Sequence, residues 1–590
     1  MLGLGFVWDD VGLYLSVPAL RDFSSFWAGT VATVHPGLHF FRPVALLTFK
    51  AQFLLFGPSP VAAHAIGLGL HTVNTFLVAL LAARIIGASG VRVALAGLLY
   101  GLHPALIEPV SWMSCRFDLL VTLWLLLALL ADLGLRHAVA RAGAIGLLFL
   151  LALNSKEMAA PFPAVLALFQ WATRYRATPW PEVGRQWLRG EAWTYAALLI
   201  VAAGYVLLRN AFIGATVDTD PDIVAELVGL PERAAFFAST VLFHLRMLVL
   251  PFDALNPLHP VDLASLAFTG CDVPALAAVA LLLAVLGAGV VRRSRSLVLL
   301  AAALLALFPV LNAVPLSIAR NIGHERYLTF PLSLVALAIA LAPFPPAPPL
   351  RRAALAGGVL AGLGWLILAV ANIRLTVPLW QSDVSLWSWA LARNPDSEYA
   401  RYSLLTSLLR VERPDLAAPL VAPPVTPNAY RALTQFELAK YLIRRGDTAD
   451  GERHLREALQ RFPPWHAEDP ADGRAQREFA THRGNIGIAY TALAELELDA
   501  GRHAAARDAV ALAEFYYPGY APALLAGALA LYGLDEAGRA RELAALALAG
   551  SADRAAATRR LDEFLDALCA APRAAQTPRS CGAPRRWGAP

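Results

Sequence analysis

The chain has 590 residues, of which 57% are hydrophobic and only 16% are charged. In soluble domains about a quarter of the residues are charged, so this composition excludes a protein that is soluble along its whole length. The formal net charge is only +5, from 49 basic against 44 acidic residues. We attribute it to loops that orient a membrane domain and expect no nucleic-acid partner.

The chain opens with the stretch "LGFVWDDVGLYL", in which Asp9 and Asp10 follow an apolar start. We predict that residues 1–58 contain the remnant of a first transmembrane helix followed by a first outer loop. A carboxylate that lies near a second carboxylate and is partly removed from water has a raised pKa, so it can accept a proton from a hydroxyl group. The two aspartates are therefore candidates for a general base. The alternative is a solvated loop start or a helix N-cap at Asp10.

Residues 59–376 predict a polytopic membrane domain, because they contain repeated apolar runs of about 16–24 residues and a bilayer core needs about 20 residues of helix. Ten spans are expected, at 60–83, 92–109, 118–135, 139–155, 158–173, 191–212, 272–291, 297–314, 328–343 and 353–375. Arginine clusters fall on every second loop, as the positive-inside rule requires. Residues 233–250 would reverse that pattern if they spanned, so we expect an interfacial or re-entrant helix there.

This topology places a set of ionisable residues at the outer ends of the spans. Arg42 precedes Pro43 at a helix start, and its planar guanidinium suits a phosphate group, although snorkelling at the interface is an alternative. Ionisable groups next to apolar spans tend to face the bundle interior or a wet cavity; local ion pairs are the alternative. The further candidates are His103, Glu108, Arg116, Asp118, Lys156, Glu157, His324, Glu325 and Arg326.

Residues 377–550 have no long apolar runs and are rich in alanine and charged residues. Two stretches, 436–463 and 487–518, both predict a helix, a turn at a glycine (Gly446 and Gly501) and a second helix ending near a proline. This plan resembles tetratricopeptide repeats, which stack into a concave surface that binds peptide; an ordinary helical-hairpin domain is the alternative. Residues 551–590 predict a terminal helix and a disordered tail. Cys569 and Cys581 could form a disulfide if this end is extracytoplasmic.

Taken in order, the motifs "FVWDD", "FRPV", "HP…IEPVSWMSCRFDLL", "LALNSKE" and "HERYLTFP", followed by the repeat-like region, resemble the transmembrane and tetratricopeptide-repeat glycosyltransferases. That family belongs to the GT-C fold class and is similar to protein O-mannosyltransferases. The resemblance implies transfer of a sugar from a polyprenyl-phosphate carrier to a hydroxyl acceptor, often Ser or Thr of a protein, at the non-cytosolic membrane face. It also implies an acidic base in the first outer loop, at Asp9 or Asp10.

The expected fold class is therefore all-α: a GT-C-like transmembrane helical bundle followed by an α-solenoid. The expected partners are a polyprenyl-phosphate-linked sugar, an acceptor protein held by the repeats, and the lipid bilayer. No cofactor is certain, but two carboxylates could hold Mg²⁺ or Mn²⁺. The alanine- and arginine-rich composition indicates a bacterial source, and hence the cytoplasmic (inner) membrane with the repeats outside the cytoplasm.

One departure from the family pattern keeps other functions open. The family's first transmembrane helix precedes the aspartates, whereas only Met1–Val7 precede the "WDD" stretch here. This departure favours a membrane-anchored scaffold without catalysis. A second alternative is an envelope enzyme similar to O-antigen ligases or polymerases, although those lack an acidic pair after the first span.

Overall fold

The computed structural model describes two units of the chain, Met1–Asn394 and Pro395–Pro590. The described residues are 1–15, 31–35, 38–87, 90–213, 227, 229–252, 255–261, 266–313, 321–343, 348–421, 429–462, 473–551, 553–570 and 581. Each unit has its own buried hydrophobic clusters.

The first unit begins with short elements in the predicted outer loop. A π-helical turn, η1 (Val11–Leu15), is followed by an antiparallel pair of strands, β1 (Val31–His35) and β2 (Leu38–Phe41), in which Val31 lies opposite Phe41. Helix α2 (Pro43–Phe56) begins at a proline, whose fixed φ suits the first helical position. The two strands depart from the expected all-α fold, and they are confined to this loop among the described residues.

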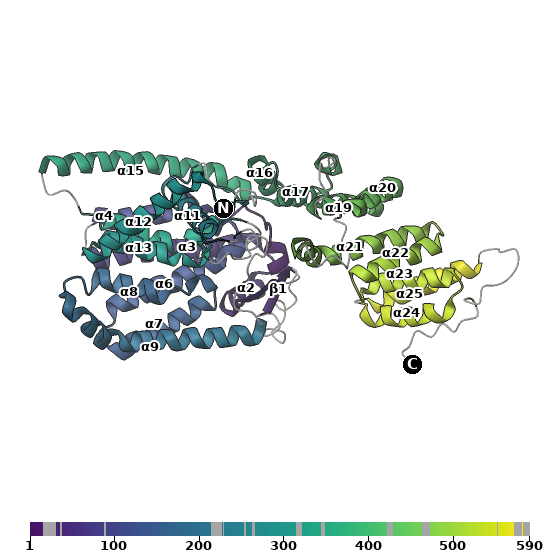
Figure 1. The fold of residues 1–590 in the computed structure, drawn as a ribbon, viewed down its shortest axis with the longest axis horizontal. Coiled ribbons are helices and arrows are strands. Elements are labelled where there is room, and N and C mark those ends of the chain that lie inside the picture. The colour runs from purple at the N-terminus through teal and green to yellow at the C-terminus, as the bar shows by residue number, and fades with distance from the viewer. Residues whose placement is uncertain are drawn as a thin grey trace. The chain divides into compact units, whose positions relative to one another are not determined.

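The rest of the first unit is helical. It contains α3 (Pro60–Ile86), α4 (Gly90–Gly101), η3 (Pro104–Leu106), α5 (Ile107–Ser111), η4 (Met113–Cys115), α6 (Arg116–Gly134), α7 (Ala138–Leu153), η5 (Glu157–Ala159), α8 (Phe162–Thr173), α9 (Trp180–Ile213), α11 (Leu230–Val249), η7 (Gly270–Asp272), α12 (Val273–Val291), α13 (Arg295–Ala306), η8 (Phe308–Val310), η9 (Glu325–Leu328), α14 (Pro331–Ala340), α15 (Pro348–Thr376), η10 (Val377–Trp380) and α16 (Asp383–Arg393). In Figure 1, α9 and α15 run along opposite sides of this bundle.

Among the described residues, fewer helices are long and apolar enough to cross a membrane than the ten spans expected. Five are long and apolar enough: Pro60–Ile86, Met113–Gly134, Trp180–Phe212, Gly270–Val291 and Leu355–Trp380. A sixth candidate is the pair Gly90–Gly101 and Pro104–Ser111, which is bent by 49°. The expected spans 139–155, 158–173, 297–314 and 328–343 form helices of 16, 12, 12 and 10 residues. At 1.5 Å per residue, none of these reaches the roughly 30 Å of a bilayer core.

The exposed surface of the long helices is apolar. On α15, Leu360 and Ile367 are 71% and 69% exposed, and on α12 Leu281 is 67% exposed. Contiguous exposed apolar surface of this kind is unfavourable in water and is stable against lipid tails. The chain is therefore a multi-pass membrane protein with five or six candidate spans.

The second unit is a series of helices joined by tight turns. They are α17 (Glu398–Arg410), α18 (Pro414–Ala417), η11 (Ala418–Val421), α19 (Ala429–Arg444), α20 (Thr448–Arg461), α21 (Gly473–Asp499), α22 (His503–Tyr516), α23 (Ala521–Gly533), α24 (Ala537–Gly550) and α25 (Arg554–Ala570). The pairs α19–α20, α21–α22 and α23–α24 are consistent with helical-hairpin repeats (Figure 1). The tail from residue 571, for which disorder was predicted, lies outside the described residues apart from Cys581.

The two turn glycines were predicted correctly. Gly446 separates α19 from α20 with φ +89°, and Gly501 separates α21 from α22 with φ +70°. A side chain disfavours this left-handed conformation, so glycine is the residue that ends the first helix at least cost.

Near the C-terminus, Cys569 at the end of α25 is joined to Cys581 by a disulfide, with the two Cα atoms 5.7 Å apart. The sequence left this bond open.

Candidate functional site

The "VWDD" stretch is fixed to the bundle through Asp10, whose side chain is fully buried. One carboxylate oxygen, Oδ1, accepts hydrogen bonds from the Ser114 backbone N–H at 2.9 Å and from the Ser114 hydroxyl at 2.6 Å. The other oxygen accepts from the Val7 N–H at 3.1 Å. Asp10 therefore joins the N-terminal segment to the turn between α5 and α6.

Trp8 holds the same segment from the other side. Its backbone adopts φ +57°, and its ring stacks on Trp112 with centroids 4.5 Å apart and packs edge-on against Trp387 at 5.1 Å. The Trp8 N–H donates to an Asp383 carboxylate oxygen at 2.7 Å. Asp9, which is half-buried, is thus held between two anchored neighbours.

Six of the predicted site residues form three ion pairs between segments that are distant in sequence. Arg42 binds Glu157 through two N–H groups, at 2.5 and 3.2 Å. Lys156 Nζ lies 2.8 Å from both oxygens of Asp118. Arg326 binds Glu108 through its guanidinium at 2.5 Å and its backbone N–H at 2.8 Å.

Aromatic rings connect these pairs. The Tyr327 ring lies 5.2 Å from both Lys156 Nζ and Arg326 Cζ. Arg326 also lies over the Trp112 ring at 5.0 Å, and Trp112 is the residue on which Trp8 stacks. Cations over aromatic faces are held by the ring quadrupole, so this arrangement links the aspartate segment to the cations. Together these residues form what we call the charged cluster: Trp8, Asp9, Asp10, Arg42, Glu108, Trp112, Asp118, Lys156, Glu157, Arg326 and Tyr327.

Burial and pairing shift the pKa values in opposite directions. Burial raises the pKa of Asp10 to about 7, against the effect of its three hydrogen bonds and helped by the charge of Asp9. Desolvation opposes ionisation of Glu157, but the charge and hydrogen bonds of Arg42 lower its pKa to about 2. Burial lowers the pKa of Lys156, and the charge of Asp118 opposes this shift. Asp10 and Glu157 therefore differ widely in proton affinity although both are carboxylates.

Two predicted residues bind uncharged partners, although the charge of Asp10 acts on one of them, Arg116. The guanidinium of Arg116 is enclosed by α2 and α3, where it donates to the Gln52 side-chain oxygen and lies 4.6 Å from the centre of the Phe49 ring. His103 caps η3 through the Ala105 N–H and contacts the Leu248 carbonyl at 3.2 Å. These contacts hold helices together.

Glu325 turns away from Arg326 toward a residue that the sequence analysis did not select. Its Oε1 lies 3.1 Å from His259 Nε2 and accepts from the Asn256 N–H at 2.9 Å. His259 is fixed by the Asn321 side chain, which accepts from its N–H at 2.6 Å. The short run "NPLHP" could have pointed to His259, because prolines on both sides restrict the backbone of a histidine in an outer loop. Only the tertiary structure brings His259 to Glu325.

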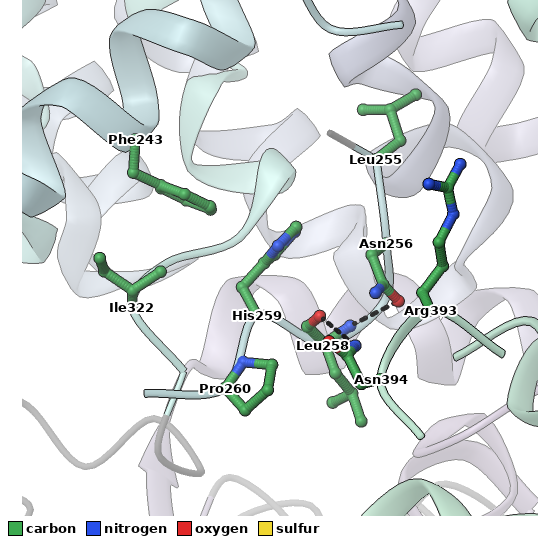
Figure 2. Close-up of a pocket in the computed structure, with 9 residues that line it drawn as sticks. All are labelled: Phe243, Leu255, Asn256, Leu258, His259, Pro260, Ile322, Arg393 and Asn394. Atoms are coloured by element: carbon green, nitrogen blue, oxygen red, sulfur yellow. Dashed lines mark hydrogen bonds between the residues drawn. The ribbon is translucent and has the colours of Figure 1, made fainter. Parts of the chain in front are cut away.

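His259 also lines a cavity of about 350 Å³. Figure 2 shows its ring on the cavity wall, with Phe243 and Ile322 on one side and Asn256, Arg393 and Asn394 on the other. Asn394 donates to the Leu258 carbonyl at 3.1 Å, which fixes that wall. Polar and apolar groups that converge on one cavity are typical of a small-molecule site.

Three buried side chains that could hold a metal ion include Glu108, the partner of Arg326, and Glu325, the partner of His259. Glu108, His324 and Glu325 are all buried, and one ligand atom from each lies within 4.8 Å of the others. The group does not include Asp9 or Asp10. Both oxygens of Asp10 already accept hydrogen bonds, so Asp10 is a poor ligand.

Comparison with known proteins shows partial homology to one family. The chain is 35% identical over 139 residues to protein O-mannosyl-transferase Tmtc1 of Drosophila melanogaster, 38% identical over 109 residues to tmtc2 of Xenopus laevis, and 29% identical over 137 residues to TMTC1 of Homo sapiens. These alignments cover 22%, 18% and 21% of this chain and only 16%, 13% and 15% of the relatives. No family model and no solved structure matches.

Proposed function

We propose that this chain is a membrane glycosyltransferase that moves a sugar from a polyprenyl-phosphate donor to a hydroxyl acceptor, such as Ser or Thr of an exported protein. The acceptor hydroxyl gives its proton to a carboxylate and its oxygen attacks the anomeric carbon. The bond from that carbon to the phosphate oxygen breaks, and the polyprenyl phosphate leaves with the bonding electron pair. The transition state is oxocarbenium-like, as in glycoside chemistry generally.

The observation that carries the proposal is the different environment of the two aspartates. Asp10 is fully buried and accepts three hydrogen bonds, so it positions the segment. Asp9 is half-buried and directly beside it, and we assign it the role of general base. The carboxyl of Asp10, whose pKa is about 7, is a second titratable group next to the base.

Arg42 is the group best suited to the leaving phosphate. Its partner Glu157 has a side chain that is 47% exposed, whereas Asp118 and Glu108 are only 5% and 2% exposed. A phosphate can therefore approach Arg42 from the side of Glu157, while Lys156 and Arg326 are held in pairs and add positive potential. Arg116 and His103 then act through packing.

Two independent observations support this activity and its membrane side. The partial homology is to proteins named protein O-mannosyl-transferases. The disulfide of the second unit is of the kind that persists in oxidising compartments, which fits a second unit outside the cytoplasm.

The test is transfer from a labelled polyprenyl-phosphate mannose in membranes that contain the full chain. Asp9→Asn is expected to reduce the rate by at least about a hundredfold, which is the usual contribution of a general base. Arg42→Gln is expected to lower the rate with wild-type folding. Sugar transfer at the wild-type rate by Asp9→Asn would contradict the assignment of Asp9 as the base. The absence of transfer with every donor would contradict the proposed enzymatic activity.

If no donor is used, the scaffold alternative gains support. The observation that favours it is the series of helix pairs in the second unit, since such repeats bind peptides. A pull-down with the tagged full chain would then recover a protein that binds the second unit, and no sugar would be transferred to that protein.

A further inference from the structure

We infer that Glu108, His324 and Glu325 form a binding site for a divalent transition metal, and that Zn²⁺ is the ion that suits it. This inference concerns ion binding and does not depend on the proposed sugar transfer. It starts from the position of the three side chains, which come from α5 and from the start of η9 and are 3%, 1% and 2% exposed.

Two polar atoms at this site are buried without a hydrogen-bond partner. His324 Nδ1 lies 3.8 Å from Glu108 Oε1, beyond hydrogen-bond distance, and Glu325 Oε2 has no donor, although its carboxyl lies against that of Glu108. Buried polar atoms are normally paired, and leaving one unpaired costs about 1–3 kcal/mol. Two unpaired atoms within the same group of three are best explained by one ligand that both of them bind.

The charges at the site point the same way. Glu108 and Glu325 are two buried carboxylates, and Arg326 binds only Glu108. Lys156, the other cation beside them, is engaged by both oxygens of Asp118. Among the described residues, the Glu325 carboxylate is therefore left with His259 and the Asn256 N–H, both on its Oε1. A cation at Oε2 would compensate this charge, which is costly to bury without a partner.

The geometry admits an ion with small side-chain movements. Three atoms that lie within 4.8 Å of one another have a common centre no more than about 2.8 Å from each, and Zn²⁺ needs about 2.0–2.2 Å to nitrogen and oxygen. Closing that difference takes small rotations of the two carboxylates and the imidazole. A histidine with carboxylates suits Zn²⁺, whereas Mg²⁺ and Ca²⁺ prefer oxygen ligands alone.

Glu325 is connected to the cavity of Figure 2 by His259, so we place the open coordination position on that side. His259 Nε2 is 3.1 Å from Glu325 Oε1, and the same ring lines the cavity. His259 is not one of the three residues whose ligand atoms lie together, so we assign the fourth position to a water from the cavity. Zinc sites with three protein ligands keep such an open position.

The experiment measures bound metal in the detergent-purified full chain by mass spectrometry after dialysis against Zn²⁺-free buffer. We expect about one Zn²⁺ per wild-type chain, and at least about a fivefold loss in His324→Ala and in Glu325→Gln, since each removes one of three ligands. The matched control is His71→Ala, because His71 is also buried in this unit and also has an unpartnered Nδ1. The control should keep its Zn²⁺.

A Zn²⁺ content of the wild type below about a tenth of an equivalent would overturn the site, and a proton on a carboxylate would then take the place of the ion. Equal Zn²⁺ contents in His324→Ala and His71→Ala would also overturn it. If both variants aggregate on size-exclusion chromatography, the wild type still decides. Added Zn²⁺ must then raise its Tm, and X-ray absorption must show a nitrogen and oxygen shell with imidazole scattering. Neither readout requires sugar transfer, so failure of the metal site is distinguishable from failure of the enzyme.

Discussion

The two units use the same charged residue types in opposite ways. In the first unit, the pair of Glu108 and Arg326 joins residues 218 positions apart, and its side chains are 2% and 13% exposed. In the second unit, Glu536 and Arg539 lie three residues apart on the surface, with side chains 35% and 75% exposed. The first pair thus joins distant segments around a buried site, whereas the second lies in water on one helix, although other pairs of the second unit, such as Arg456 and Glu497, join neighbouring helices.

The largest expected effect breaks the buried network. Arg326→Ala leaves Glu108 as a buried charge without its main partner, which typically costs about 3–5 kcal/mol. The measurement is the shift of the unfolding midpoint of the full chain in detergent. The double variant Glu108→Gln with Arg326→Met removes both charges and should lose less than Arg326→Ala. A single variant as stable as the wild type would contradict the buried-pair interpretation.

The next effect concerns the second unit's covalent link. Cys569→Ser opens a loop whose ends are 12 residues apart, and closure of a loop of that length is worth about 3 kcal/mol in the chain-entropy model. Limited proteolysis of a C-terminally tagged chain should show faster loss of the tag. Wild-type protein treated with a reductant should behave like the variant; if reduction has no effect, the bond contributes nothing to stability.

A smaller effect depends on pH through Asp10. Its pKa is about 7 in the folded chain against 3.8 as the ordinary value, so between these values the unfolded chain releases a proton that the folded chain keeps. Stability should therefore fall as pH rises from 5 to 7 and level off above, by about 2 kcal/mol. Asp10→Asn should lack this slope. Parallel pH profiles of the variant and the wild type would show that Asp10 is ionised throughout.

A turn glycine tests the helix pairs of the second unit. Gly501→Ala places a side chain at φ +70° and should cost about 1 kcal/mol. The control is Gly538→Ala, because Gly538 lies within α24 where an added Cβ meets nothing within 4 Å. Helix propensity makes that substitution neutral or stabilising. Equal losses in both variants would argue against the turn.

The smallest effect is expected at the surface. Arg539→Ala removes an exposed pair on one helix and should change stability by less than about 0.5 kcal/mol. The same chemical change, loss of one arginine, thus differs in size between the units, and unfolding midpoints of the two arginine variants measure this difference directly. Similar losses of stability in Arg326→Ala and Arg539→Ala would contradict the expected difference between the two ion pairs.

The sequence predicted elements more reliably than sites. Apolar runs identified the five long spans, because a helix in lipid must satisfy its own backbone over a fixed length. The glycines at 446 and 501 identified their turns, because the left-handed conformation is a property of one residue. Other apolar runs that were expected to span form shorter helices, since a helix such as α14, ten residues long, ends at a break that hydropathy does not register.

The sequence by itself determined which residues are ionisable next to apolar spans, and that Asp9 and Asp10 head this set. Only the tertiary structure decided their partners: Asp10 with Ser114, Arg42 with Glu157, and Glu325 with His259 instead of with Arg326. The physical reason is that burial and pairing depend on contacts between segments up to 375 residues apart. A pattern along one segment specifies its helix and its polarity, but not which distant charge will reach it.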